Sequence, residues 1–423
     1  MIAPGTSTNA RGRRAVTAAV VGNLLEWYDF AVYGYLALIL AKRFFPQGDE
    51  LSALLSTFAT FGVGFVVRPL GGILIGRLGD VKGRKAALAL TILLMAAGTV
   101  AIGLLPTYEQ IGLWAPALLV CARLLQGFAA GGEWGGATAF IVEWAPERQR
   151  GLFGSFQQSS VAAGLLLGSG IAAALSSALS PADMEAWGWR VPFLLGGLLG
   201  PVGLYMRRNI EETPAFQRAH ETAPAVHLAS PAALAARAFG FTVLWTTAYY
   251  VLLSYMPTFT QKHVGLGRSE ALWSNTLALL ALVVAAPIAG ALSDRIGRKP
   301  LLLGCCGAMV LLAYPLFQLM LSRPTFALVA MVQGCFALMI AAFSGPGPAA
   351  IAEIFPTRIR STWMSTGYSL AVAVFGGFAP FIATWLIART GSPLAPTGYL
   401  IGAALISTLA ILSLRETAHD KLA

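Results

Sequence analysis

The first long apolar run of the sequence carries polar and ionisable side chains at helical spacing. Asn23, Glu26, Asp29 and Tyr33 are separated by three, three and four residues, which places them along one face of a helix. Two carboxylates three residues apart repel each other when both are ionised, so we expect one of them to hold a proton near neutral pH. The pattern predicts a proton carrier. A structural alternative is that Glu26 pairs with an arginine and that Asp29 caps a break in the helix.

A later apolar run carries Arg123, Gln126 and Glu133 on one helical stripe. Arg123 and Glu133 would lie about 15 Å apart along the helix axis, so they cannot pair with each other. The planar guanidinium of Arg123 suits a carboxylate, which could belong to a substrate or to Glu26 or Asp29 across a bundle. Ionisable residues inside a membrane are costly, so function is the default hypothesis. Glu133 therefore joins Glu26 and Asp29 as a candidate for proton coupling.

The composition predicts the membrane scaffold that these side chains need. The chain has 423 residues, of which 57% are hydrophobic and 11% charged, against roughly 25% charged in soluble domains. Apolar runs long enough to cross about 30 Å of hydrocarbon recur along the chain. We count twelve, at residues 15–41, 52–76, 86–106, 112–144, 152–179, 190–207, 238–260, 271–292, 301–321, 325–351, 362–388 and 397–414. The predicted fold is an all-α membrane protein of twelve transmembrane helices.

The longest polar gap divides these helices into two sets of six. It predicts an N-terminal bundle over 1–206, a linker over 207–237 and a C-terminal bundle over 238–423. With an even number of spans, both termini and the linker share one side of the membrane. Most Lys and Arg residues outside the runs fall on that side, so the positive-inside rule places both termini in the cytoplasm. We expect the chain in the cell inner membrane.

The two halves repeat two motifs at the same end of corresponding helices. Gly76-Arg-Leu-Gly-Asp80-Val-Lys-Gly83-Arg84-Lys85 recurs as Gly290-Ala-Leu-Ser-Asp294-Arg-Ile-Gly297-Arg298-Lys299, and Glu143-x-x-Pro146-x-Arg148-x-Arg150 recurs as Glu353-x-x-Pro356-x-Arg358-x-Arg360. The glycines permit tight turns, and the aspartates can accept from backbone amides at a helix start and pair with arginine. We expect an ion-pair latch that closes the cytoplasmic side in one state. A positive-inside anchor with solvated pairs is the alternative. The gating candidates are Arg68, Asp80, Gly83, Arg84, Glu143, Arg150, Asp294, Gly297, Arg298, Glu353 and Arg360.

The second half offers aromatic and neutral polar side chains, rather than charges, at the depth of the bilayer. Such residues suit a surface that closes on a substrate, although many of them will serve packing or the membrane interface. The candidates for substrate contact, with those of the first half, are Tyr33, Arg123, Gln126, Trp245, Tyr249, Tyr250, Trp273 and Gln333.

The chain resembles the major facilitator superfamily, and within it the metabolite:proton symporters, the group of proline/betaine, alpha-ketoglutarate, shikimate and citrate transporters. Besides the repeated loop motif, the resemblance is carried by Gly22-Asn23-Leu-Leu-Glu26-Trp27-Tyr28-Asp29-Phe30, Arg68-Pro69-Leu-Gly71-Gly72, Arg123-Leu-Leu-Gln126-Gly127, Gly131-Gly132-Glu133, Trp187-Gly-Trp-Arg190-Val-Pro192-Phe193, Glu211-Glu-Thr-Pro214-Ala-Phe216 and Phe355-Pro356-Thr357. It implies two six-helix bundles related by a pseudo-two-fold axis, a central cavity and rocking-bundle alternating access. It also implies proton coupling by Glu26, Asp29 and Glu133, a substrate or coupling role for Arg123, and a cytoplasmic gate at Asp80 and Asp294.

We therefore expect a proton-coupled importer of a small carboxylate-bearing metabolite. An organic acid is preferred because Arg123 supplies a buried cation. Betaine or proline is the alternative, since Trp245, Tyr249, Tyr250 and Trp273 could cage a cationic group, and an uncoupled facilitator is a weaker one. An enzyme is not expected, because the apolar runs hold no histidine and no nucleophile–base pair. We expect a monomer with no cofactor, metal or nucleic-acid partner, driven by the proton gradient.

Overall fold

The computed structural model describes residues 23–24, 26–46, 48–82, 84–146, 148–208 and 231–420 of the chain. Nearly all of these residues are helical. Seven helices in this part of the chain are long and apolar enough to cross a membrane. Shorter or interrupted helices complete the twelve-helix architecture predicted from the apolar runs.

The helices of the first half follow the apolar runs in chain order. After the helical residues 26–35 come α2 (Ala37–Phe44), α3 (Glu50–Val66), α4 (Arg68–Lys82), α5 (Arg84–Leu104), α6 (Tyr108–Ile111), α7 (Trp114–Ala129), η1 (Ala130–Gly132), α8 (Glu133–Trp144), α9 (Arg150–Ala178), α10 (Pro181–Asp183), η2 (Met184–Gly188) and α11 (Arg190–Arg208).

The second half begins with a span that π-helical turns interrupt. The described elements of this half are α13 (Pro231–Tyr249), η3 (Tyr250–Tyr255), α14 (Met256–Phe259), η4 (Thr260–Val264), α15 (Arg268–Ile296), α16 (Arg298–Ser322), α17 (Phe326–Ser344), α18 (Gly347–Glu353), α19 (Thr357–Ala371), η5 (Val372–Gly377), α20 (Ala379–Thr390) and α21 (Ala395–Leu412).

Local sequence signals explain several of these boundaries. The carboxylate of Asp49 accepts from the backbone amides of Leu51 and Ser52 and so caps α3. Gly297 separates α15 from α16 and has φ = +100°, a conformation in which any side chain would be strained. The tight turn predicted at Gly297 is therefore present.

The fourth span is interrupted where the sequence predicts one helix over 112–144. The α-helix ends at Ala129, and the 3-10 helix η1 precedes α8. Gly131 lies here against the backbone of α4, because a Cβ at this position would clash with the carbonyl oxygen of Arg68. Glycine is a poor helix former, and its missing side chain allows the close approach of α4.

The predicted linker over 207–237 falls largely on residues 209–230, which lie outside the described residues. α11 continues to Arg208, and α13 already begins at Pro231. Helical structure therefore reaches into both ends of the segment expected as linker.

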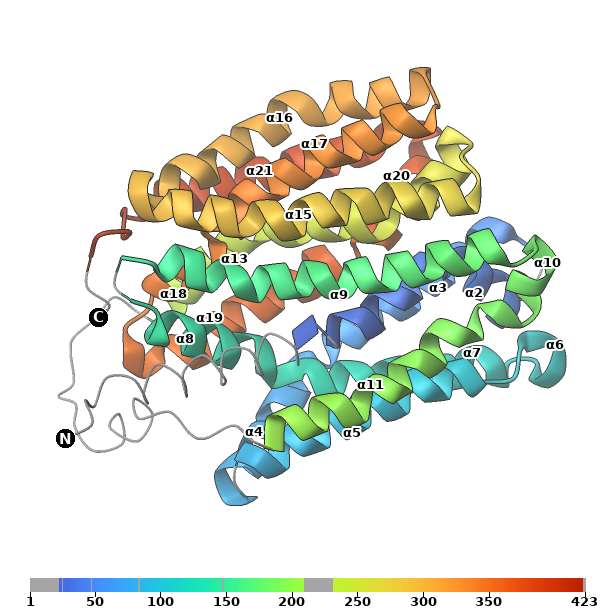
Figure 1. Cartoon of the computed structure of the whole chain (residues 1–423), viewed down its shortest axis with the longest axis horizontal. Helices are drawn as coiled ribbons and strands as arrows, with labels where there is room; N and C mark the ends of the chain where they lie inside the picture. The colour runs from blue at the N-terminus through green and yellow to red at the C-terminus, as the bar shows by residue number, and fades with distance from the viewer. Residues whose placement is uncertain are drawn as a thin grey trace, which may run out of the picture.

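The two halves meet along a pair of long helices. α9 of the first half and α15 of the second run side by side (Figure 1). Beyond α15 lie α16, α17 and α21, and beyond α9 lie α11, α5 and α7 (Figure 1). One end of the molecule holds α8, α18 and α19, and the opposite end holds α6 and α10. We call these the latch end and the far end.

Candidate functional site

A cavity lies between the two halves. The empty space around its lining side chains, which includes space open to solvent, amounts to about 270 Å³. The lining comes from residues 26–35 and α9 in the first half, and from α13, η3 and α19 in the second. It consists of Trp27, Gln158, Val161, Trp245, Thr246, Tyr249, Tyr250 and Tyr368. Neither half forms the cavity alone, and most of its wall is aromatic.

Packed rings hold part of this wall in place. The indole of Trp134 stacks on Tyr368 with ring centroids 3.5 Å apart and ring planes 3° apart. Trp245 meets both rings edge-on, at 6.0 Å from Trp134 and 6.2 Å from Tyr368. Its indole N–H donates to Oγ of Ser344 at 2.9 Å. These contacts present the rings to the cavity in a defined orientation.

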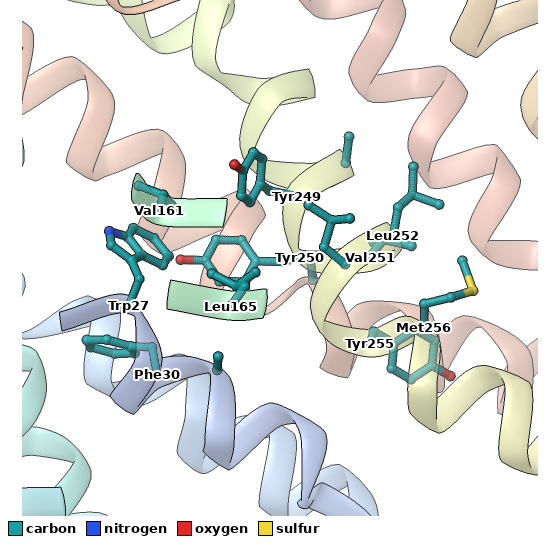
Figure 2. Packing of buried hydrophobic residues seen from close by; sticks show 14 of the residues in the cluster. Trp27, Phe30, Val161, Leu165, Tyr249, Tyr250, Val251, Leu252, Tyr255 and Met256 are labelled. Atoms are coloured by element: carbon teal, nitrogen blue, oxygen red, sulfur yellow. The ribbon is translucent and has the colours of Figure 1, made fainter. Parts of the chain in front are cut away.

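Three hydroxyl groups at the cavity have no hydrogen-bond partner among the described residues. They belong to Thr246, Tyr249 and Tyr250, whose side chains are at most 5% exposed. Figure 2 shows Tyr250 pointing toward Trp27, whereas Tyr249 points in another direction. Buried hydroxyls normally have a partner, so these three are available to a bound molecule.

The buried guanidinium of Arg123 lies among aromatic rings. The centroids of Phe30, Tyr33 and Phe61 are 4.8, 4.6 and 5.0 Å from its central carbon. Arg123 also donates to Oε1 of Gln126 at 2.8 Å. Tyr33 and Gln126, which the sequence suggests as substrate contacts, therefore contact Arg123.

Arg68 occupies a similar position beside the cavity wall. Its side chain is buried, and its guanidinium carbon lies 5.8 Å from the Trp27 ring, 4.7 Å from Phe30 and 4.4 Å from Phe65. Its Nε and Nη2 atoms have no hydrogen-bond partner within the described ranges. Arg68 thus packs against three aromatic rings of the first half.

Asp29 faces the same group of residues. Its carboxylate is 6% exposed, interacts with the hydroxyl of Thr99 and lies within electrostatic range of Glu26 and Arg123. Thr99 also accepts from Nε2 of Gln126 at 2.7 Å. The structure therefore places Asp29 close to Glu26, with which it shares a helical face, and close to Arg123 on α7.

The duplicated charged motifs pair across the two halves. Arg150 at the start of α9 contacts Glu353 at the end of α18 at 3.0 Å. Arg360 on α19 contacts Glu143 on α8 at 2.7 Å. The first pair is almost fully buried, whereas Glu143 is 24% exposed. The acid of each motif copy binds the arginine of the other copy.

Asp294 joins the halves in a different way. Its carboxylate accepts from the backbone amides of Gly151 and Leu152 at 2.8 and 2.9 Å, so it caps the start of α9 from the opposite half. Arg298 donates to Asp294 at 2.7 Å and to Glu353 at 3.3 Å. Asp294 and Arg298 thus complete an ion-pair cluster at the latch end.

The segment after α21 packs against this cluster, a contact that no motif in the sequence indicates. Glu416 accepts from the backbone amides of Arg298 and Lys299 at 2.9 Å each, and Thr417 donates to Glu353 at 2.6 Å. Burial raises the pKa of the Glu416 carboxyl, but the backbone amide donors outweigh that effect and hold its pKa below the ordinary value. We call residues 413–420 the tail.

Ion pairs also join the halves at the far end. Glu185 in η2 accepts from Lys42 at 3.2 Å and from Arg268 of α15 at 3.1 Å. Lys262 in η4 contacts Glu50 of α3 at 2.9 Å. Burial raises the pKa of Glu185, but the two bases outweigh it and lower the pKa overall. These pairs are not apparent from the sequence, because their members belong to no repeated motif.

The remaining candidates lie elsewhere. Trp273 is 40% exposed on α15 and donates to Ser177 of α9 at 3.1 Å, and Gln333 is buried in α17. Neither is among the residues that line the cavity, whereas Trp27 and Tyr368, absent from the predicted contacts, are. Four further candidates, or their side chains, lie outside the described part of the structure: Asp80, Gly83, Arg84 and Glu133.

Sequence relatives match almost the whole chain. A glycine betaine/proline/ectoine/pipecolic acid transporter of Dickeya dadantii is 36% identical over 98% of this chain and 85% of its own. A proline/betaine transporter of Escherichia coli is 35% identical over 97% and 85%. A citrate-proton symporter of Klebsiella pneumoniae is 36% identical over 94% and 90%.

Family models and solved structures agree with these relatives. The model described as Sugar (and other) transporter matches residues 15–226, and the Major Facilitator Superfamily model matches residues 260–422. A partially occluded, inward-open structure of the Escherichia coli xylose transporter has a TM-score of 0.74 at 18% identity, over 98% of this chain and 100% of the other. A D-xylose-proton symporter structure has a TM-score of 0.72 at 22% identity, over 94% and 96%. These structures share the fold, and together with the sequence relatives they show that this chain belongs to the major facilitator superfamily of membrane transporters.

Proposed function

We propose that this chain is a proton-coupled symporter that imports a small zwitterion of the betaine or proline kind. The observation that carries the proposal is the cavity, whose lining is aromatic, aliphatic, amide and hydroxyl in character. A buried net charge without a partner is costly, so such a lining favours a solute whose own charges sum to zero. The names of the proline/betaine relatives support the same class.

The lining offers a contact for each end of such a solute. The ring faces of Trp27, Trp245 and Tyr368 suit a substituted ammonium group, with about 2 kcal/mol for a desolvated cation–π contact. The unpaired hydroxyls of Tyr249 and Tyr250 can donate to the carboxylate.

We assign proton coupling to Asp29 in the first place. Its Oδ1 has no hydrogen-bond partner within the described residues. Protonation removes the buried charge, and deprotonation makes the carboxylate a partner for Arg123, so the two states of Asp29 favour different neighbours. Glu26 and Glu133 are further candidates for carrying the proton.

Alternating access then requires each end to open in turn. Ion pairs join the two halves at both ends, Arg150–Glu353 at the latch end and Glu185–Arg268 at the far end, so we interpret the structure as an occluded state. We assign the latch end to the cytoplasm, because the positive-inside rule places its basic loops there. The protein would then act as a monomer in the cell inner membrane with both termini in the cytoplasm.

An organic acid is the second candidate substrate. Arg68 and Arg123 are buried cations, and the citrate-proton symporter of Klebsiella pneumoniae is a relative. The rings of Phe30, Phe61 and Phe65 surround these arginines, so a carboxylate would have to displace aromatic side chains to reach them. We therefore rank the zwitterion first, in reverse of the preference based on sequence.

Proteoliposomes that contain a pH-sensitive dye test the proposal. Betaine with proline and, separately, citrate with other organic acids are added outside, with protein-free liposomes as the control for acid leak. Acidification of the interior by the zwitterions alone is the expected result. Acidification by the organic acids alone would support the second candidate, and entry of labelled solute without protons would identify an uncoupled facilitator.

A further inference from the structure

We propose that Tyr250 couples the solute cavity to the buried arginines, as a positioning residue whose ring transmits solute binding to Arg68 and Arg123. The inference rests on the proposed function, since it concerns how symport is coupled. Tyr250 is a side chain of the second half that lies against side chains of the first. It is therefore placed to act in any rearrangement that moves the halves relative to each other.

The ring of Tyr250 contacts three rings of the first half. The centroid distances are 6.3 Å to Trp27, 5.9 Å to Phe61 and 5.3 Å to Phe65. Tyr250 also lines the cavity, with a hydroxyl that has no partner among the described residues. Figure 2 shows it pointing toward Trp27. One side chain thus contacts both the solute space and the aromatic cluster behind it.

The same three rings hold the two arginines. Trp27 and Phe65 lie against Arg68 at 5.8 and 4.4 Å, and Phe61 lies against Arg123 at 5.0 Å. Several guanidinium nitrogens of these arginines have no hydrogen-bond partner in the described ranges. Their positions therefore respond to the rings, and a shift of Tyr250 changes the surroundings of both cations.

The backbone at Tyr250 offers a place where such a shift can occur. Tyr250 is the first residue of the π-helix η3, and π-helical turns often mark functional sites within α-helices. Gly376 of the π-helix η5 also lies close to this ring, because a Cβ at Gly376 would come within 2.9 Å of the Tyr250 ring. The ring thus packs against a glycine of the second half as well as aromatic rings of the first.

These contacts define a coupling step. A solute carboxylate that accepts from the Tyr250 hydroxyl fixes the ring against Phe61 and Phe65. The rings in turn fix Arg68 and Arg123, which changes the partner that the carboxylate of Asp29 meets. The ring of Tyr250 carries the coupling, whereas its hydroxyl contributes to solute affinity.

The test distinguishes the role of the Tyr250 ring from that of its hydroxyl. It measures the proton:solute ratio and KM in proteoliposomes. Tyr250→Phe should raise KM about tenfold, through loss of one hydrogen bond to a charged group, and keep the ratio of wild type. Tyr250→Leu should lower the ratio at least fivefold while counterflow exchange continues. Phe65→Leu, which alters the ring contact from the other half without lining the cavity, should lower the ratio and leave KM unchanged.

Tyr249→Phe and Tyr249→Leu are the matched controls. Tyr249 has the same chemistry and lines the same cavity, but no ring contact with the first half is found for it within the described residues. Both should change KM and keep the ratio.

Two outcomes would overturn the inference. A coupled wild type whose ratio persists in both Tyr250→Leu and Phe65→Leu would refute this role of Tyr250 and leave the proposed function standing. A wild type that moves solute without protons would refute the proposed function, and the role of Tyr250 with it. Size-exclusion profiles and counterflow activity show whether each variant is folded. If either Tyr250→Leu or Phe65→Leu fails to fold, the other variant, in the opposite half, still tests the inference.

Discussion

The buried pair of Arg150 and Glu353 allows the strength of the latch to be worked out. Glu353 accepts from Arg150 at 3.0 Å and from Arg298 at 3.3 Å. Arg298 belongs to the same half as Glu353, so that contact persists when the halves separate, and only the contact with Arg150 is lost. Glu353→Gln replaces this ion pair by a hydrogen bond from the charged arginine to a neutral amide and leaves the buried arginine charge less compensated, at a cost of about 2 kcal/mol. The open population should then rise about 30-fold.

A cysteine at Ser155 can report this opening. Ser155 on α9 is fully buried and faces Gly290 of α15, where a Cβ would lie 2.8 Å from the serine side chain. A maleimide can reach Ser155→Cys only after α9 and α15 separate. With the four native cysteines replaced by alanine, the labelling rate of the purified protein in detergent, where both ends are accessible, follows the open population.

Two other substitutions that remove a carboxylate provide a scale for the labelling rate. Glu143 pairs with Arg360 across the halves but is partly exposed, so Glu143→Gln should cost up to about 1 kcal/mol and raise labelling up to about fivefold. Glu270→Gln removes an exposed charge at the far end and should leave labelling unchanged. If Glu353→Gln labels no faster than Glu270→Gln, the interpretation of the pair as a latch is wrong.

Three further predictions concern the cavity, the proton site and the tail. Trp245→Ala should raise KM for a quaternary ammonium solute about 30-fold, through loss of a cation–π contact of about 2 kcal/mol. Trp273→Ala should leave this KM unchanged. The uptake of labelled solute measures KM in both variants. Asp29→Asn should abolish accumulation driven by a pH gradient, because an amide carries no proton, yet allow counterflow exchange; accumulation at the wild-type level would contradict the assignment. The folded-state pKa of Glu416 lies below its ordinary value of 4.5, so its contribution to tail docking is complete above that pH and is lost as the pH falls through the folded-state value. A spin label at His419→Cys should become more mobile below pH 4.5, and Glu416→Gln should remove that pH dependence.

The sequence is sufficient to predict the fold class of this chain. Runs of apolar residues of membrane-spanning length require helices, because backbone polar groups have no other partners in hydrocarbon. The comparisons confirm the superfamily and its twelve-helix fold. The fourth span differs from the prediction, because an apolar run does not reveal that Ala130–Gly132 packs against the backbone of Arg68.

Short-range spacing also predicts part of the candidate site. Glu26 and Asp29 share a helical face because helical geometry is local. Arg123 lies within electrostatic range of Asp29. The repeated motifs contain the charged residues that form the ion pairs at the latch end. Repetition alone does not show that Glu143 pairs with Arg360 and Arg150 with Glu353.

Only the tertiary structure decides which helix faces meet. The cavity takes Trp27 and Tyr368 and leaves out Trp273 and Gln333, although all four lie in apolar runs. The difference arises from the rotation of each helix about its axis and from contacts between residues more than a hundred positions apart. The sequence by itself therefore determines the helices, the superfamily and the chemistry available, whereas packing decides which side chains form the cavity, which charges pair, and that the tail reaches Glu353.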